Sequence, residues 1–436
     1  MMSDSGPHDH GMATTTPPRR LRWLTQHPYV DLLANRHLRR LYLGLFIASL
    51  GAGMAVVAVP WLALEIAGSV NRAFAVAAAG TAAFLPGIPV SLLAGWRRWR
   101  IRSRTILLVD AALRFVCFTL IGFLALTHHL GLGPYLVILS ISSLARGLSY
   151  GARRTAIDEL IAPNQRLAAN PLLGFSIQLG LDVLGPVTGG LLVAGPGAGV
   201  ALLVYAGSSA ILYGLALTLP ISARTAQAAG AQTGQEAPQG PRLSVLRSVP
   251  SMVLWLIGIT FVFNFLYGPI DVGLPIFVQH SLGAGSTLYG QMFTVFGVGS
   301  LVGGLAVGGL RRESVVQWVT VLSIIGWGGA ALLLAVAHSP AVALLSFGLG
   351  GLLYGPFTAA SVSAIQAATP IAEQGPIISL WAGMTLGALP LGTLVGGPLV
   401  AGLGTRGTFA LCAALTLALG AATLARILGP SRNVPG

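Results

Sequence analysis

Long apolar segments alternate with short polar ones along almost the whole chain. Each is 17 to 25 residues long, the length that lets a helix cross the roughly 30 Å apolar core of a bilayer. The pattern predicts an all-α integral membrane protein with twelve transmembrane helices in two six-helix bundles. The predicted spans are Leu41–Leu64, Phe74–Gly95, Ile106–Leu126, Pro134–Tyr150, Leu172–Val193, Ala198–Leu219, Met252–Ile276, Tyr289–Leu310, Val315–Val336, Ala341–Ala364, Ile377–Ala401 and Phe409–Ile427.

Composition agrees with a membrane protein. Of 436 residues, 54% are hydrophobic and 8% are charged, whereas roughly 25% are charged in soluble proteins. The first apolar segment has the length of a full span and no cleavage-like sequence after it, so we expect it to remain as an anchor rather than a signal peptide. Both cysteines, Cys117 and Cys412, lie within apolar segments and imply no disulfide.

The net charge of +13 follows from membrane topology. All 25 basic residues are arginine, and 21 of them lie in alternate loops or at the termini. Arg72 and Arg406 lie in the other loops, while Arg114 and Arg146 lie inside apolar segments. Short arginine-rich loops stay in the cytoplasm. We therefore expect both termini to be cytoplasmic and no nucleic-acid partner.

A polar segment and an internal repeat divide the chain into halves. Residues Ser222–Arg247 are rich in Ala, Gln, Gly, Thr and Pro, a composition typical of a linker. The predicted units are a cytoplasmic tail and amphipathic lead (1–38), a first bundle (39–220), a linker (221–248), a second bundle (249–428) and a tail (429–436). Four short matches relate the halves in order: Val57–Pro60 with Val272–Pro275, Gly95–Arg98 with Gly309–Arg312, Gly147–Gly151 with Gly351–Gly355, and Gly189–Gly190 with Gly396–Gly397.

A duplicated bundle of six spans favours a transporter. In such proteins the substrate binds near the midplane between the repeats, and rocking of the halves opens this site to each side in turn. The chain contains no lysine and therefore no Gly-x-x-x-x-Gly-Lys nucleotide-binding loop. We expect no enzyme activity, no cofactor and no metal. A channel or a lipid scramblase of similar composition stays an alternative.

Two segments resemble a known family. Leu33–Leu41 is similar to a short amphipathic lead into a first span, and Gly185-Pro186-Val187-Thr188-Gly189-Gly190 matches an antiporter motif. With these motifs the chain resembles the major facilitator superfamily, and within it the bacterial drug and siderophore exporters. The resemblance implies a proton antiporter in a prokaryotic inner membrane. Close packing of glycine-rich helices is the alternative interpretation of Gly185, Pro186, Gly189 and Gly190.

The resemblance is incomplete after the second span. The family's signature there is Gly-x-x-x-Asp-Arg-x-Gly-Arg-Arg, of which Gly95 and the following arginines are present. Trp99 stands where the signature has its acidic residue, and the equivalent loop Gly309–Glu313 keeps only two arginines. In the fourth span, Arg146 lies near the family's conserved arginine, but the following glycine is one residue out of step.

Few ionisable residues fall within the predicted spans, and such residues are expensive in lipid. Asp182 lies near the middle of the fifth span, so we predict that it binds and releases a proton in each cycle; a structural role is the alternative. Glu65 and Asp271 lie near the outer ends of spans one and seven. They are further proton-coupling candidates, or simply solvated carboxylates at the interface.

Two other groups of residues are candidates for the substrate path. Asp110, Arg114 and Arg146 should reach a similar depth and form a charge network, either neutralising one another or contacting an anionic substrate group. Asn264, Tyr267, Tyr354 and Trp381 should line a cavity for amphipathic molecules, or else serve packing alone. The expected function is proton-coupled efflux of small drug-like or siderophore-like compounds by a monomer, with an uncoupled facilitator or importer as the alternative.

Overall fold

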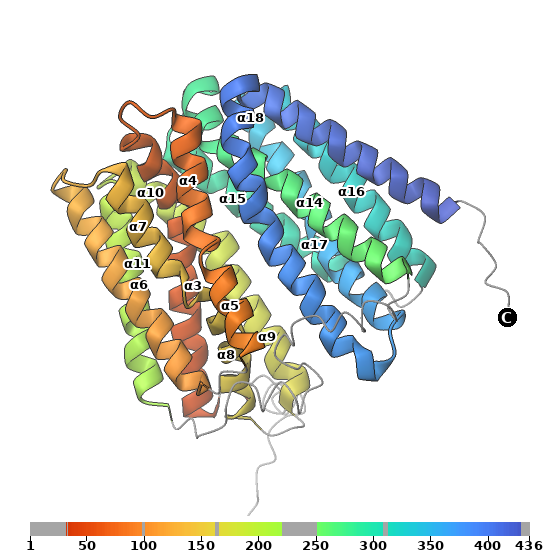
Figure 1. Cartoon of the computed structure of the whole chain (residues 1–436), viewed down its shortest axis with the longest axis horizontal. Coiled ribbons are helices and arrows are strands. Elements are labelled where there is room, and N and C mark those ends of the chain that lie inside the picture. The colour runs from red at the N-terminus through yellow and green to blue at the C-terminus, as the bar shows by residue number, and fades with distance from the viewer. Residues whose placement is uncertain are drawn as a thin grey trace, which may run out of the picture.

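The computed structural model describes residues 32, 34–97, 101–161, 165–219, 251–307 and 313–428, and helices make up nearly all of these ranges (Figure 1). The helices of the first half are α3 (Arg36–Glu65), α4 (Arg72–Phe84), α5 (Gly87–Trp96), α6 (Ser103–Leu126), α7 (Leu132–Ser143), α8 (Arg146–Asp158), α9 (Arg166–Gln178), η2 (Leu179–Leu184), α10 (Gly185–Ala194) and α11 (Ala198–Leu217). Those of the second half are α14 (Ser251–Ile276), η3 (Phe277–Ser281), α15 (Ser286–Val307), α16 (Glu313–Ala335), α17 (Pro340–Ala367) and α18 (Ile371–Leu428).

The predicted spans correspond to helices of the structure. Among the described residues, eleven helical segments are long and apolar enough to cross a membrane, and the last, Leu380–Leu428, is long enough for two crossings. Its helix, α18, turns at Gly404, where φ is 72°. Glycine adopts this left-handed conformation without steric cost. The loop expected at 402–408 is thus a tight turn at one glycine, and this turn accounts for the twelfth span.

Side chains satisfy the backbone at several helix ends. The side chain of Asn35 accepts hydrogen bonds from the amides of His37 and Leu38 at the start of α3, and Asn71 caps α4 in the same way. Arg406 donates to the carbonyl oxygens of Ala335, the last residue of α16, and of Ala337, which are 2.8 and 2.6 Å away. These bonds matter because a bilayer offers no hydrogen-bond partners to exposed backbone groups.

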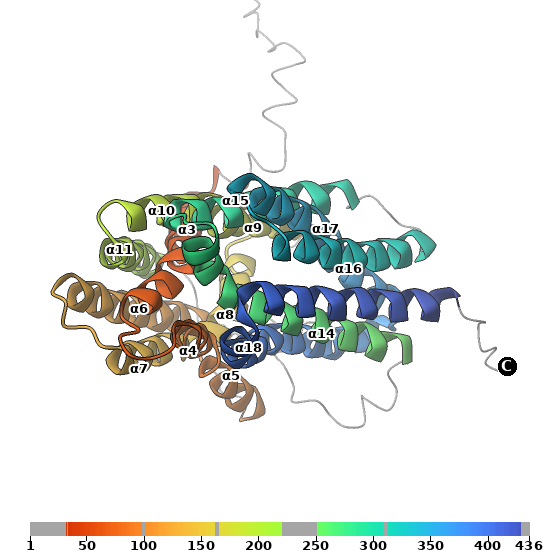
Figure 2. The same ribbon diagram turned by 90° about the horizontal axis from the view of Figure 1, so that it is seen from above.

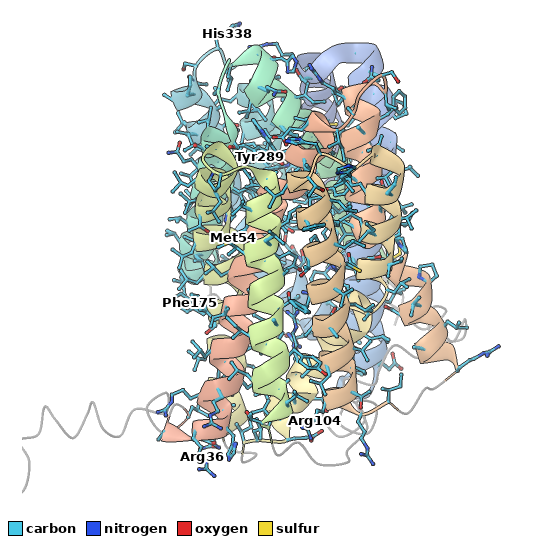
Figure 3. The ribbon with its side chains drawn as sticks, turned by 90° about the vertical axis from the view of Figure 1, so that its left-hand side faces the viewer. Arg36, Met54, Arg104, Phe175, Tyr289 and His338 are labelled. Carbon is cyan, nitrogen blue, oxygen red and sulfur yellow. The ribbon has the colours of Figure 1, made fainter. Side chains whose placement is uncertain are left out.

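The helices form two bundles that lie side by side and touch at one end (Figures 1 and 2). Arg36 and Arg104 mark the other end, here named the arginine-rich end, while His338 lies at the opposite end (Figure 3). The bundles diverge towards the arginine-rich end. The predicted linker 221–248, the tail 429–436 and most of the N-terminal segment 1–38 lie outside the described residues.

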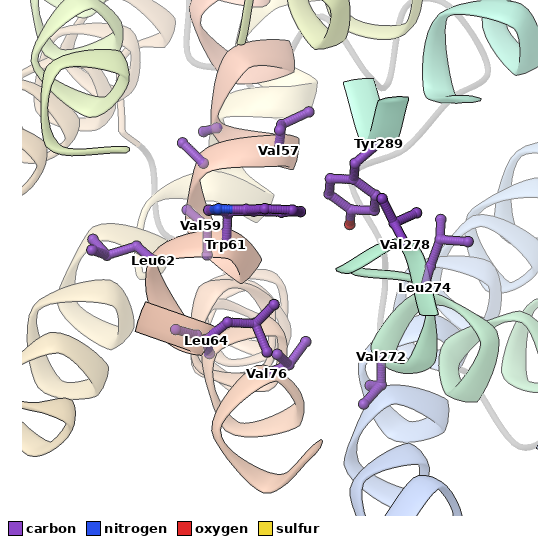
Figure 4. Close-up of a cluster of buried hydrophobic side chains, with 14 of the residues drawn as sticks. Val57, Val59, Trp61, Leu62, Leu64, Val76, Val272, Leu274, Val278 and Tyr289 are labelled. Carbon is purple, nitrogen blue, oxygen red and sulfur yellow. The ribbon is translucent and has the colours of Figure 1, made fainter. Parts of the chain in front are cut away.

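A hydrophobic cluster joins the two bundles near the opposite end. It contains residues of both halves, including Val57 and Trp61 of α3 and Val272 and Tyr289 of the second half. The rings of Trp61 and Tyr289 face each other across the interface, with centroids 6.2 Å apart (Figure 4). Since lipid exerts no hydrophobic pressure between helices, this contact depends on close van der Waals packing.

Candidate functional site

Asp182 lies where the fifth span departs from α-helical geometry. The span consists of α9, the six-residue π-helical segment η2 and α10, and Asp182 is in η2. The side chain is partly exposed and has no ion pair with any described residue. Single π-helical turns occur often at functional sites. The structure therefore places an uncompensated acid at a local irregularity near the middle of a span.

The second half packs directly against this segment. Gly297 of α15 lies so close that a Cβ there would collide with the backbone carbonyl of Asp182. One residue further along η2, the Val183 carbonyl accepts a hydrogen bond of 2.8 Å from Thr294. Towards the opposite end, Ser286 donates to the Gly190 carbonyl over 3.0 Å. Contacts between spans five and eight thus run from Asp182 to the opposite end of the molecule.

The antiporter-like motif lies where three helices meet. Gly185 packs against Gly53 of α3, and Gly189 packs against the backbone of Met54. Gly190 faces α15, near Gly290, whose own neighbour is the carbonyl of Pro186. Small residues allow such backbone approach. The packing interpretation of the motif is therefore visible in the structure, while its role in antiport stays a prediction.

An aromatic cluster of the second half surrounds the indole of Trp327. The Tyr267 ring lies 5.7 Å from that of Trp327, and the Phe296 ring is 5.7 Å from Trp327 and 5.6 Å from Tyr354. The hydroxyl of Tyr354 donates to Oδ1 of Asn264 over 3.3 Å. Trp327 is buried, whereas Tyr267, Phe296 and Tyr354 are partly exposed. The partly exposed rings form a wall in front of the buried indole.

Two acids lie beside this wall. Asp182, from the other half of the molecule, meets it at α15, where a Cβ on Gly297, the residue after Phe296, would touch both the carbonyl and the Cβ of Asp182. Asp271 follows Tyr267 by one helical turn in α14. The structure thus brings together the predicted residues Asp182, Asp271, Tyr267 and Tyr354, and with them Asn264. The resulting site combines aromatic faces with two carboxylates.

Two further predicted residues are not part of this group. Trp381 lies at its margin and Glu65 lies outside it. The indole of Trp381 donates to Oγ1 of Thr260 over 3.1 Å, and the carbonyl of Thr260 accepts from Asn264. Trp381 therefore borders the aromatic cluster through Thr260. Glu65 is exposed at the end of α3, and no described hydrogen bond or ion pair joins it to Asp271. The role of Glu65 in proton coupling therefore stays a prediction.

The predicted charge network is a compact cluster inside the first bundle. Arg114 binds the carboxylate of the buried Asp110 through two contacts, from Nε to Oδ1 at 3.0 Å and from Nη2 to Oδ2 at 2.8 Å. Arg153 lies 3.9 Å from Oδ2 of the same carboxylate. Arg146 stacks over the Phe84 ring, with its guanidinium carbon 4.4 Å from the ring centroid. These distances pair the single carboxylate of Asp110 with Arg114 and Arg153, which favours the interpretation that these charges offset one another.

Comparison with known proteins decides the family. The model of the Major Facilitator Superfamily matches residues 41–314 and 260–435. The chain belongs to the Major Facilitator Superfamily. Multidrug efflux pump Tap of Mycobacterium tuberculosis is 27% identical over 378 residues, covering 83% of this chain and 87% of the pump. The solved nucleoside transporter NupG superposes with a TM-score of 0.68 at 15% identity, covering 88% of this chain and 99% of NupG.

Membership establishes a multi-pass membrane transporter rather than an enzyme. Another relative, an uncharacterised transporter of the superfamily from Sinorhizobium fredii, is 26% identical over 337 residues, covering 73% of this chain and 78% of the relative. Trp99, which stands in place of the acid of the superfamily signature after the second span, lies among residues 98–100, outside the described residues.

Sequence reasoning missed several residues of the site and of the charge cluster. Trp327 and Phe296 lie in apolar runs, where an aromatic residue gives no sign of facing a polar site. Arg153 belonged to a predicted cytoplasmic loop, but α8 continues as a helix to Asp158 and brings this side chain to Asp110. Tyr205, 3.4 Å from Nη1 of Arg114, was likewise unmarked in the sequence. The fourth span was predicted to end at Tyr150. A prediction that its helix continues to Asp158 would have placed Arg153 on the helix.

Proposed function

We propose that the protein is a secondary active exporter that couples the efflux of small amphipathic compounds to proton entry. The observation that carries the proposal is the position of Asp182. It is an acid without a charged partner among the described residues, at a π-helical segment in direct contact with the other half of the transporter. An isolated charge in this setting is costly, so protonation changes the energy of the contact between the halves. The similarity to multidrug efflux pump Tap supports export as the direction.

The arginine distribution supports an orientation with the arginine-rich end in the cytoplasm. In this orientation the halves meet on the external side and diverge towards the cytoplasm. Such an arrangement would admit a substrate from the cell interior. Protonation from outside would then require the external contacts to open, as alternating access demands.

Asp182→Asn should abolish uphill transport while leaving exchange intact. Asparagine has a similar shape but cannot take up a proton, so the substituted transporter can still change conformation around its substrate. The measurement uses purified protein in proteoliposomes with an imposed pH gradient and an amphipathic dye such as ethidium. Proton-driven accumulation should fall to the level of protein-free liposomes, and exchange of labelled for unlabelled dye should persist.

Glu373→Gln, which removes an acid from the first turn of α18, is the matched control and should retain proton-driven accumulation. Uphill transport by Asp182→Asn would contradict the coupling assignment. A wild-type protein that equilibrates dye but never concentrates it would instead be the uncoupled facilitator, and flux without saturation would indicate a pore.

A second prediction concerns the external contact between Arg72 and His280. Arg72 begins α4 of the first half, and its Nη1 contacts Nε2 of His280 in η3 of the second half. Replacing Arg72 by Gln should favour the outward-open state by about two- to fivefold, the effect of an exposed polar contact.

The measurement is labelling of Tyr354→Cys by an impermeant maleimide from outside, with Cys117 and Cys412 replaced by Ala. His280→Ala should act in the same direction and His338→Ala should have no effect; unchanged labelling in the first two variants would refute the role of this contact.

A further inference from the structure

The seventh span ends in a π-helical segment at the end of the molecule where the bundles meet. This segment, η3, follows α14 directly and takes part in two contacts between the halves. Val278 is buried in the hydrophobic cluster that joins the bundles (Figure 4). His280 contacts Arg72 of α4. The position of η3 therefore contributes to both contacts that hold the halves together at this end.

An arginine from the turn between the last two spans holds η3 in place. The guanidinium carbon of Arg406 lies 5.2 Å from the centroid of the Phe277 ring, the first residue of η3. The same guanidinium donates to the carbonyl oxygens of Ala335 and Ala337, 2.8 and 2.6 Å away. The Phe277 ring also meets that of Phe409 edge-on, with centroids 5.4 Å apart. Arg406 thus joins the end of the ninth span to the last turn of the seventh.

This combination of contacts suits the chemistry of arginine. A guanidinium is planar, carries its N–H donors in a fixed fork and stacks on aromatic faces. It can therefore bond two carbonyl groups and present its face to a ring at the same time, within the roughly 6 Å at which a cation is attracted to an aromatic ring. Among the described residues Arg406 forms no ion pair, so no acid competes for its charge.

We infer that Arg406 is a positioning residue for the closure of the transporter at this end, because it holds η3 where His280 and Val278 reach the first half. The inference rests on the proposed function in one point, the orientation that makes this end external. The contacts of Arg406 lie within the second half, so it acts through η3 rather than by touching the first half. Loss of Arg406 frees η3, weakens the contact of His280 with Arg72 and shifts the population towards the outward-open state.

The test measures access to the centre of the transporter without any gradient. Tyr354→Cys in the full-length, otherwise cysteine-free chain is labelled by an impermeant maleimide in right-side-out and inside-out membrane vesicles. Arg406→Gln should raise the rate of external labelling by about two- to fivefold. Phe277→Leu should act in the same direction, because it removes the ring but leaves the bonds of Arg406 to the carbonyl groups. Arg406→Lys should give a smaller increase, since lysine keeps the charge without the planar fork.

A double variant shows whether Arg406 acts through the contact of η3 with the first half. Arg72→Gln removes that contact directly. If Arg406 acts through η3, the double variant Arg72→Gln with Arg406→Gln should label no faster than the faster of the two single variants. Independent effects would instead multiply, giving about a 4- to 25-fold increase, and would overturn the inference.

Arg426→Gln is the matched control. Arg426 lies near the C-terminal end of the same helix, α18, with its guanidinium carbon 5.0 Å from the Trp255 ring centroid, and its loss should leave external labelling unchanged. Thermal denaturation of each variant reports its stability. Unchanged labelling in both Arg406→Gln and Phe277→Leu, with or without a loss of stability, would refute the positioning role.

The same experiment separates this inference from the proposed function. A faster reaction of Arg406→Gln in inside-out vesicles alone would support the positioning role and refute the proposed orientation. Faster external labelling of Arg406→Gln, in a transporter whose wild type shows no proton-driven accumulation, would support the positioning role and refute the coupling proposal.

Discussion

Gly297→Ala is expected to slow transport by about tenfold or more while the protein stays folded. The glycine faces the backbone carbonyl of Asp182, and an added Cβ cannot occupy that space without separating α15 from η2. Overpacking of this kind costs about 1–3 kcal/mol, which shifts a two-state equilibrium by about 5- to 150-fold. The contact joins the two halves in the conformation in which they meet on the external side. The substitution therefore destabilises that conformation and shifts the equilibrium towards the outward-open state. Initial rates of ethidium efflux in proteoliposomes measure the effect.

The control is Gly258→Ala in α14, where an added Cβ meets no atom within 4 Å. It should transport at the wild-type rate, since alanine also favours the helix slightly over glycine. Gly297→Ala should also raise external maleimide labelling of Tyr354→Cys in a cysteine-free background. Normal transport by Gly297→Ala would show that α15 and η2 do not need to approach this closely. A loss of transport with loss of the folded protein would instead assign Gly297 to stability.

The spans could be predicted because one physical requirement dominates them. A helix that crosses a bilayer must be apolar over about 20 residues, so hydropathy alone located the segments that the structure contains as helices. The loop at 402–408 was predicted, but not its form, since nothing in the sequence shows that a single glycine with positive φ, Gly404, makes the turn. Likewise no local sequence pattern marks the π-helical segment Leu179–Leu184, which packs against α3 and α15, helices far apart in the sequence.

Site residues could be predicted where placing the side chain in lipid has a high free-energy cost. Asp182 and Asp271 stood out because acids are rare in spans, and the structure places Asp182 against α15 and Asp271 one helical turn after Tyr267. Aromatic residues carry no such cost, so Trp327 and Phe296 could not be distinguished from ordinary packing residues. Their assignment needed the distances between helices far apart in the sequence.

Asp110→Asn is expected to destabilise the protein more than any single substitution of the arginines around it. The carboxylate is 1% exposed and holds Arg114 through two contacts, with Arg153 at 3.9 Å. Its loss leaves several buried positive charges without their common partner, a change that costs about 3–5 kcal/mol. Arg114→Gln should cost less, because Arg153 stays beside the carboxylate and continues to offset its charge. Thermal denaturation of the purified variants in detergent, followed by intrinsic fluorescence, measures both effects.

The double variant Asp110→Asn with Arg114→Gln tests whether the two residues stabilise the protein as an ion pair or independently of each other. It removes one charge of each sign, so its stability should exceed that of Asp110→Asn alone. The difference between the double variant and the sum of the single variants gives the coupling energy of the pair. Additive losses would mean that the charges act independently and would contradict the cluster described above. A recovery in stability would show that Asp110 serves chiefly to offset the charges of the arginines around it in the first bundle.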